Sequence, residues 1–148
     1  NCKQIKYIDI SANQKITDLN HLSNLKELKA YNHSKINDSG IANCYNISAL
    51  NIANNPNIVN INHLTNLTVL ISYGNSGITN DGIKKCCNIK YLDINRNKNI
   101  TDINHLSNLY FLDISGKTCS MRKHGFIECK KLRKVNVYHN DHIDINNA

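Results

Sequence analysis

The chain repeats itself in short units, and this periodicity constrains its fold more than any other feature. Recurrent apolar-x-x-apolar segments mark seven units, whose successive spacings are 20, 22, 20, 22, 20 and 23 residues. The units start at Ile5, Leu25, Ile47, Leu67, Ile89, Leu109 and Leu132. A unit of about 20 residues cannot bury its own apolar side chains, so it must stack on its neighbours as a solenoid.

The pattern inside each unit predicts one short strand. Positions one, four and six are apolar, as in Ile89, Leu92 and Ile94, and the alternation over positions four to six is typical of a strand. One strand per unit stacks as a parallel sheet. We therefore expect an α/β fold, a right-handed solenoid of about seven repeats with its parallel sheet on the concave side.

The remainder of each unit predicts two kinds of connection. Odd units favour an extended or 3₁₀ segment. Even units favour a short helix, because residues able to cap one precede it. These caps are Asn37, Asp38, Asn80 and Asp81.

Asparagine recurs at position nine, where the chain turns off the strand. Stacked asparagine side chains can satisfy backbone groups of neighbouring loops. The predicted ladder consists of Asn13, Asn55, Asn75, Asn97 and Asn140. His33 and Lys117 interrupt it in the second and sixth units, so we expect those loops to deviate.

Two alternating repeat types carry a resemblance to a known family. Odd units close on segments such as Asn62-His63-Leu64-Thr65-Asn66, and even units on Ile78-Thr79-Asn80-Asp81-Gly82-Ile83 followed by Cys86. The chain resembles leucine-rich-repeat proteins: its odd units are similar to internalin-like and phosphatase-regulator-like repeats, and its even units to the cysteine-containing repeats of F-box substrate receptors. The resemblance implies non-catalytic protein recognition. The second subtype also implies the substrate-receptor part of a ubiquitin ligase.

The 148 residues provide for a single leucine-rich-repeat domain spanning residues 1–148. Both ends look like the interior of a repeat and neither carries a polar cap, so we expect a fragment of a longer solenoid. If the chain is complete, exposed apolar ends predict end-to-end self-association, a structural role. The apolar runs are only a few residues long, which excludes a membrane span or signal peptide within this sequence.

The cysteines indicate packing more than chemistry. Cys2, Cys44 and Cys86 lie 42 residues apart, and Cys129 holds the same place after a one-residue insertion. Two strand spacings separate such positions by about 10 Å, beyond the roughly 7 Å that a disulfide spans. We expect free, buried thiols at these periodic positions, leaving Cys87 and Cys119 as the candidates for reactivity. Reduced cysteines favour a cytoplasmic protein.

Composition extends the prediction of location. The 27 asparagines and 21 isoleucines are typical of an AT-rich genome, such as that of a protist or a large DNA virus. For a viral protein, this adds the host-cell cytoplasm or the virion as locations.

Catalytic, metal and cofactor sites have no persuasive candidate. His21, His63 and His105 recur every 42 residues, too far apart to share one metal ion. Cys119, His124 and Cys129 fall in one irregular segment but lack the paired cysteines of a zinc site. We expect no enzyme activity, no metal and no cofactor.

Outward positions of the strands provide the candidate binding surface. Aromatic side chains occupy positions three and seven, with charges among them, and exposed tyrosines are typical of protein interfaces. Asp9, Asp93 and Asp113 share position five and predict an acidic stripe. We predict that a protein or peptide binds Tyr7, Asp9, Tyr31, Tyr73, Tyr91, Asp93, Arg96, Phe111, Asp113 and Tyr138.

A basic segment in the sixth and seventh units accounts for most of the net charge of +7. Such a run is typical of a solvated loop, and the alternative is an anionic partner. Phe126 is the only aromatic residue available there for base stacking, which disfavours nucleic acid. The candidate residues of this loop are Lys117, Arg122, Lys123, Lys130 and Lys131.

Overall fold

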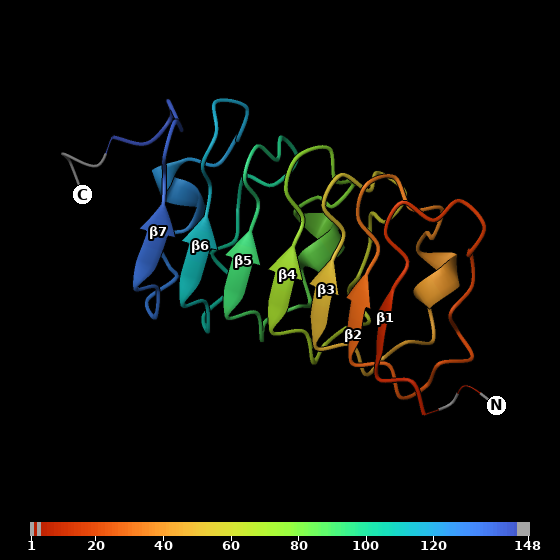
Figure 1. Ribbon diagram of the computed structural model, residues 1–148. Helices are drawn as coiled ribbons and strands as arrows, with labels where there is room; N and C mark the ends of the chain where they lie inside the picture. The colour runs from red at the N-terminus through yellow and green to blue at the C-terminus, as the bar shows by residue number, and fades with distance from the viewer. Residues whose placement is uncertain (1, 3, 145–148) are drawn as a thin grey trace.

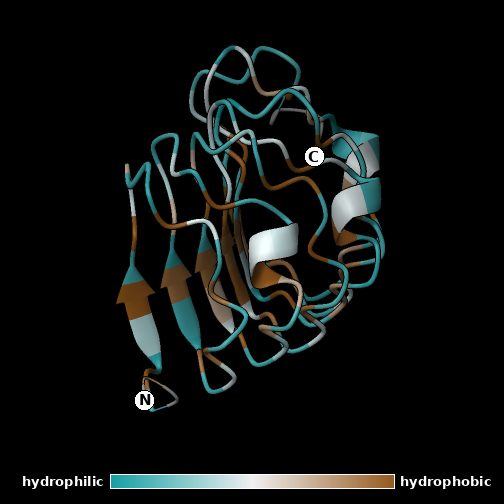
Figure 2. Ribbon diagram, turned by 90° about the vertical axis from the view of Figure 1, so that its right-hand side faces the viewer, coloured by the Kyte–Doolittle hydropathy of each residue, from teal (hydrophilic) through white to brown (hydrophobic). Residues whose placement is uncertain are grey.

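Seven short strands form one parallel sheet in the order of the sequence (Figure 1). The computed structural model describes residue 2 and residues 4–144. The strands are β1 (Tyr7–Asp9), β2 (Glu27–Lys29), β3 (Ala49–Asn51), β4 (Val69–Ile71), β5 (Tyr91–Asp93), β6 (Phe111–Asp113) and β7 (Lys134–Asn136). Three 3₁₀ helices lie across the stack from the sheet (Figure 2): η1 (Ser39–Ile41), η2 (Asp81–Ile83) and η3 (Lys123–Gly125). This arrangement confirms the predicted solenoid of seven units.

The strands pair position by position, so equivalent residues of successive units form straight rows. Leu70 pairs with Leu92, and Leu92 with Leu112. Each strand covers positions three to five, one residue earlier than predicted. Position six still bonds to the next unit, as when Ile94 N donates to Asp113 O at 2.9 Å. The predicted inward residues Leu92 and Ile94 are both fully buried.

The helices of the even units are single 3₁₀ turns, and the residues that the structure describes contain no α-helix. Close stacking explains this difference from prediction. A Cβ atom at Gly82 would lie 2.0 Å from the carbonyl oxygen of Val59 in the preceding unit, so η2 packs backbone against backbone. A unit of this length leaves room for one tight turn. No described helix is long and apolar enough to cross a membrane.

The predicted caps act mostly between units. Asn37 lies one residue before the N-cap position of η1, and its Oδ1 accepts a hydrogen bond from Gly40 N at 3.1 Å. Asp38 instead accepts from Val59 N at 2.8 Å in the next unit. Asn80 accepts from Thr101 N at 2.9 Å in the same way.

A ladder of buried side chains follows the strands, but asparagine occupies it only in odd units. Asn97 Nδ2 donates to Ser72 O at 2.9 Å, and Asn55 and Asn140 make the equivalent bond to the unit before them. Asn75 was predicted in this ladder and is exposed. Its place is taken by Ser76, because the loop of the even unit is one residue longer before it turns inward.

A second set of asparagines, 42 residues apart, holds the 3₁₀ turns. Asn62 Nδ2 donates to Asp81 O at 2.7 Å, while its Oδ1 accepts from Lys85 N at 2.7 Å. Asn20 and Asn104 make the same pair of bonds to the next even unit. The asparagine-rich composition therefore contributes directly to the contact between units.

Buried thiols also link successive units. Cys44, Cys86 and Cys129 are buried as predicted, and each Sγ donates to a carbonyl of the preceding unit, at 3.3 Å for Cys86 to Ile61 O. Burial raises the pKa of the Cys86 thiol to about 12. The prediction was wrong for Cys2, which is exposed.

The two off-period thiols have different environments. Cys119 was predicted to be reactive and is fully buried, at the ladder position of the sixth unit, with Sγ 3.6 Å from Ile94 O. Burial raises the pKa of this thiol above its usual value. Cys87 is exposed and remains the candidate for reactivity.

We expect Asn97→Ala to lower the free energy of unfolding by roughly 2–3 kcal/mol, because it leaves buried backbone groups without partners. Those groups include Ser72 O and the amide of Ile100, whose nitrogen lies 3.2 Å from Asn97 Oδ1. The matched control is Asn75→Ala, which should change stability by less than about 0.5 kcal/mol. Urea unfolding followed by circular dichroism measures both, and equal losses would contradict the ladder.

Candidate functional site

The outward side chains of the sheet form three parallel rows. Position three carries Tyr7, Glu27, Ala49, Val69, Tyr91, Phe111 and Lys134. Position five carries Asp9, Lys29, Asn51, Ile71, Asp93, Asp113 and Asn136. Position seven, just after the strands, carries Ser11, Tyr31, Ala53, Tyr73, Asn95, Ser115 and Tyr138.

The structure divides the predicted binding residues between two ends of this face. Tyr7 and Asp9 lie on β1, where Lys29 Nζ is 5.3 Å from the centre of the Tyr7 ring. Four strand spacings, about 19 Å, separate β1 from β5. The sequence predicted an acidic stripe that contains both Asp9 and Asp93. This separation shows that the prediction was wrong for Asp9. Tyr31 and Tyr73 lie half-buried between these ends.

Strands β5 and β6 bring two aromatic rings together. The rings of Tyr91 and Phe111 stack with their centres 4.4 Å apart and their planes 5° from parallel. Both lie on the sheet surface, and 36% of the area of Tyr91 is accessible to solvent. A shallow, largely apolar hollow of about 260 Å³ adjoins them, lined by Thr68, Val69, Lys90, Tyr91, Tyr110 and Phe111.

Two carboxylates lie two positions further along the same strands. Asp93 pairs in register with Asp113. Burial raises the pKa of Asp93 above its usual value, and the negative charge of Asp113 adds to the effect. Both side chains also shape the turn after the strand, since Asp93 Oδ1 accepts from Asn95 N at 3.0 Å and Asp113 Oδ1 from Ser115 N at 2.9 Å.

Beyond the carboxylates, the loops after β5, β6 and β7 enclose a hollow of about 390 Å³, which we call the loop hollow. It joins Arg96 and Tyr138, predicted on the protein-binding face, with Lys117 of the predicted basic loop. Its lining is Asn95, Arg96, Ser115, Gly116, Lys117, Thr118, Tyr138 and His139.

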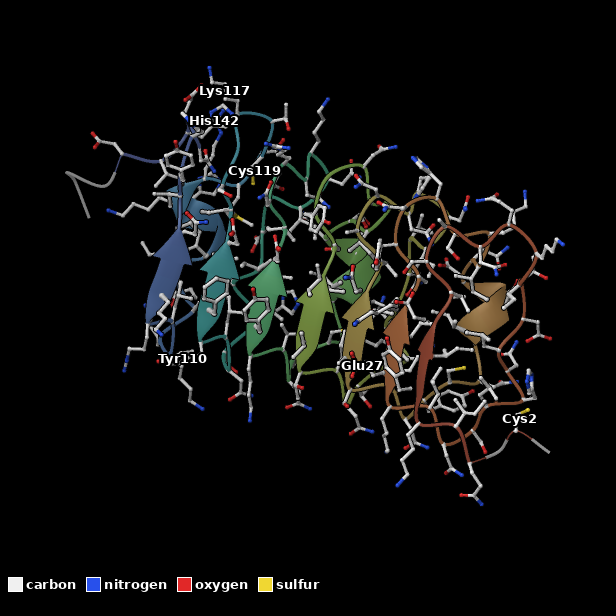
Figure 3. The ribbon with its side chains drawn as sticks, in the orientation of Figure 1. Cys2, Glu27, Tyr110, Lys117, Cys119 and His142 are labelled. Carbon is white, nitrogen blue, oxygen red and sulfur yellow. The ribbon has the colours of Figure 1, made fainter. Side chains whose placement is uncertain are left out.

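The rest of the basic loop is dispersed over the molecule. Lys117 lies beyond the carboxyl end of β6 (Figure 3), whereas Arg122 and Lys123 belong to η3 across the stack. Lys130 and Lys131 precede β7, where they pair with Glu128 and Asn108. The sequence run therefore does not form one basic patch, because a unit turns through the whole circumference of the solenoid.

Sequence reasoning missed the edge where the strands begin. Tyr110 lies at this edge (Figure 3), and Lys134 Nζ is 6.0 Å from the centre of its ring. The repeat pattern could have indicated Tyr110, because it holds position two of its unit, directly before the outward position three. His139 lies among the aromatic residues of the binding face in the sequence, and it lines the loop hollow.

Metal chemistry has no support from side-chain clustering. Among residues 2 and 4–144, no three His, Cys, Asp or Glu side chains are grouped as metal ligands. His63 and His105 instead bond to backbone carbonyls of the preceding even unit, through Nε2 at 3.0 Å and 3.1 Å.

Comparisons with known proteins identify the fold. No protein-family model matches the sequence, and no curated protein matches it. Two internalins of Listeria monocytogenes str. 4b F2365 have similar structures. The match to the internalin inlF covers 97% of this chain and 51% of inlF, with a TM-score of 0.65 and 17% sequence identity. For internalin C2 the TM-score is 0.61 with 20% identity, covering 97% of this chain and 76% of that one.

This chain thus spans about half the length of inlF, and both likenesses establish the fold alone. The fold is an internalin-like leucine-rich-repeat solenoid, as the sequence predicted. A fold does not by itself determine a function, so any function must be argued from the residues of the sheet face.

The raised pKa of Asp93 predicts the pH dependence of one substitution. The carboxyl group of Asp93 binds its proton more tightly in the folded protein than in the unfolded chain, where its pKa is about 3.8. The folded protein therefore loses stability as the pH rises from 3.8 through the raised pKa. Asp93→Asn should remove this cost and keep the turn, because Asn51 forms the same turn by accepting from Ala53 N at 3.1 Å. We expect a gain at pH 7 of roughly 0.2–1 kcal/mol, the range for relieving opposed like charges on neighbouring strands, and a smaller gain at pH 3.

Asp9→Asn is the matched control, because hydrogen bonds from Ser11 lower the pKa of Asp9. A lowered pKa stabilises the fold at pH values above 3.8 and loses that contribution as the pH falls. Asp9→Asn should therefore lose stability at pH 7 relative to pH 3. Urea unfolding at both pH values tests the pair, and pH trends of the same sign would contradict the assignment.

Proposed function

We propose that the sheet face over β5 to β7 binds a partner protein or peptide and that the protein is a recognition module without catalytic activity. The stacked pair of Tyr91 and Phe111 is the observation that carries this proposal. Large aromatic side chains supply much of the energy at protein interfaces. Here they lie beside an apolar hollow that can receive a side chain of the partner.

Rigid placement of these rings favours binding. Each ring lies on a strand whose two neighbours pair with it in register. A surface that is ordered before binding loses little conformational entropy when the partner arrives. The internalin-like fold supports this role in general terms, since its stacked units present a continuous face.

The buried thiols support a proposal about the cellular compartment and the repeat subtype. Cys44, Cys86 and Cys129 each use Sγ–H as a hydrogen-bond donor between units, which requires the reduced form. We infer a reducing compartment such as the cytoplasm. The same donors favour the cysteine-containing repeat subtype for the even units, and with it the substrate-receptor role as a second candidate.

We expect Tyr91→Ala combined with Phe111→Ala to weaken partner binding by about 2 kcal/mol, or roughly 30-fold. Tyr45→Ala is the control, because Tyr45 is an exposed tyrosine beside η1 that packs against His63 away from the sheet face. Pull-down from lysate with quantitative mass spectrometry identifies the partner, and titration of that partner measures affinity.

Thermal melting should show that all three proteins are folded. A partner that is lost from the sheet-face variant and kept by Tyr45→Ala supports the proposal. A partner list unchanged by the sheet-face variant would overturn it.

A further inference from the structure

Within the proposed function, we propose that the bound segment is an extended peptide with an apolar, a basic and an acidic side chain at alternate positions. The apolar side chain lies over Tyr91 and Phe111, the basic one over Asp93 and Asp113, and the acidic one in the loop hollow. This proposal rests on the sheet face being the binding surface, and adds the chemistry of the partner.

The lining of the loop hollow fits an anion. Arg96, Lys117 and His139 contribute cationic or proton-donating groups, and no carboxylate of the described residues lines the space. Tyr138 adds a largely exposed hydroxyl donor. A second hollow of about 390 Å³ shares Arg96 and adds Lys98, again without a carboxylate among its lining residues. A carboxylate or phosphate would find charge-assisted donors there.

The backbone places Arg96 and His139 at a position that ordinarily suits smaller residues. Position eight has positive φ in all seven units, and the other occupants are Ala12, Asn32, Asn54, Gly74 and Gly116. Arg96 and His139 both adopt φ of 56°, a conformation that costs large side chains energy.

Local packing holds Arg96 in place. A Cβ atom at Gly116 would lie 2.4 Å from Arg96 Cγ, so the arginine side chain packs over this glycine. Thr118 Oγ1 donates to Arg96 O at 3.2 Å. The guanidinium stem is therefore fixed at the edge of the hollow.

The carboxylate pair fits a cation. Directly opposed like charges on neighbouring strands repel each other, and Asp93 and Asp113 are such partners. A lysine or arginine of the partner placed over both would offset this repulsion.

The spacing of the three zones fits an extended chain. Alternate positions of a strand are about 6.6 Å apart, and so are side chains on one face of an extended peptide. Positions three, five and seven of β5 and β6 present the aromatic pair, the carboxylate pair and the entrance to the loop hollow in that order. A peptide along the strands can therefore contact all three zones with residues i, i+2 and i+4.

The same order disfavours a polyanion. A nucleic-acid backbone following the strands would have to pass the carboxylates of Asp93 and Asp113 between the aromatic pair and the cationic hollow. A peptide can place a basic side chain there. The observations therefore favour a peptide.

Four capped pentapeptides of identical composition test the charge order. Phe-Thr-Lys-Thr-Glu and its reverse carry the proposed order in the two chain directions, and Phe-Thr-Glu-Thr-Lys and its reverse exchange the charges. Nitrogen–proton NMR titration of the folded protein measures affinity and locates the shifts. We expect the better peptide of the proposed order to bind about tenfold more tightly than either charge-exchanged peptide, with shifts on β5 to β7.

A charge-matched pair of variants assigns this preference to the loop hollow. Arg96→Gln combined with Lys117→Gln should remove most of the tenfold preference. Lys84→Gln combined with Lys85→Gln removes the same charge beside η2 and should keep it.

The outcomes separate this proposal from the proposed function. Equal affinity for all four peptides, absence of binding, or equal effects of the two double variants would overturn the charge order. If the shifts then still map to Tyr91 and Phe111, or the pull-down still depends on these rings, the recognition face stands and only the partner chemistry is wrong.

Discussion

Each repeat depends on its neighbours because it is too short to enclose a core of its own. Apolar rows such as Leu70, Leu92 and Leu112 are buried only when the units stack in register. Asparagine side chains add hydrogen bonds across the same boundaries, as Asn62 does between the third unit and η2. Stability therefore accumulates along the chain, and the regularity of the sheet is a consequence of this dependence.

That regularity leaves the outward positions free to vary in chemistry. Positions three and five contribute little to the core, and position three accordingly holds side chains as different as Tyr91, Val69 and Lys134. Strands β5 and β6 use this freedom to place an aromatic pair, a carboxylate pair and a cationic hollow in succession. The chemical order of the face therefore comes from residues that the fold does not require.

Periodicity made the fold predictable from sequence, because a fixed spacing of apolar residues determines both strand register and inward positions. Leu92 and Ile94 are buried as this spacing predicts. The geometry of the turns was harder to predict from the sequence. Asn75 is exposed and Ser76 is buried because the turn of that even unit is one residue longer. In the sixth unit the turn is two residues longer, and Cys119 takes the buried position.

The candidate site was predictable only in part. Alternation places Tyr91 and Phe111 outward, but their contact depends on strand pairing. Lys117 and Arg122 are close in sequence and lie on different sides of the solenoid, so a run of basic residues misled the prediction of a patch. Arg96 and Lys117 line one hollow because the loops of neighbouring units lie side by side.

Photo-crosslinking tests the central claim, that the face over β5 and β6 is the working surface. A benzophenone amino acid replaces Phe111 in one protein and Tyr45 in another, and each is irradiated with the partner from the pull-down. The account predicts a crosslinked complex from position 111, with little from position 45. Efficient crosslinking from position 45 and none from position 111 would place the working surface beside η1 and contradict the account.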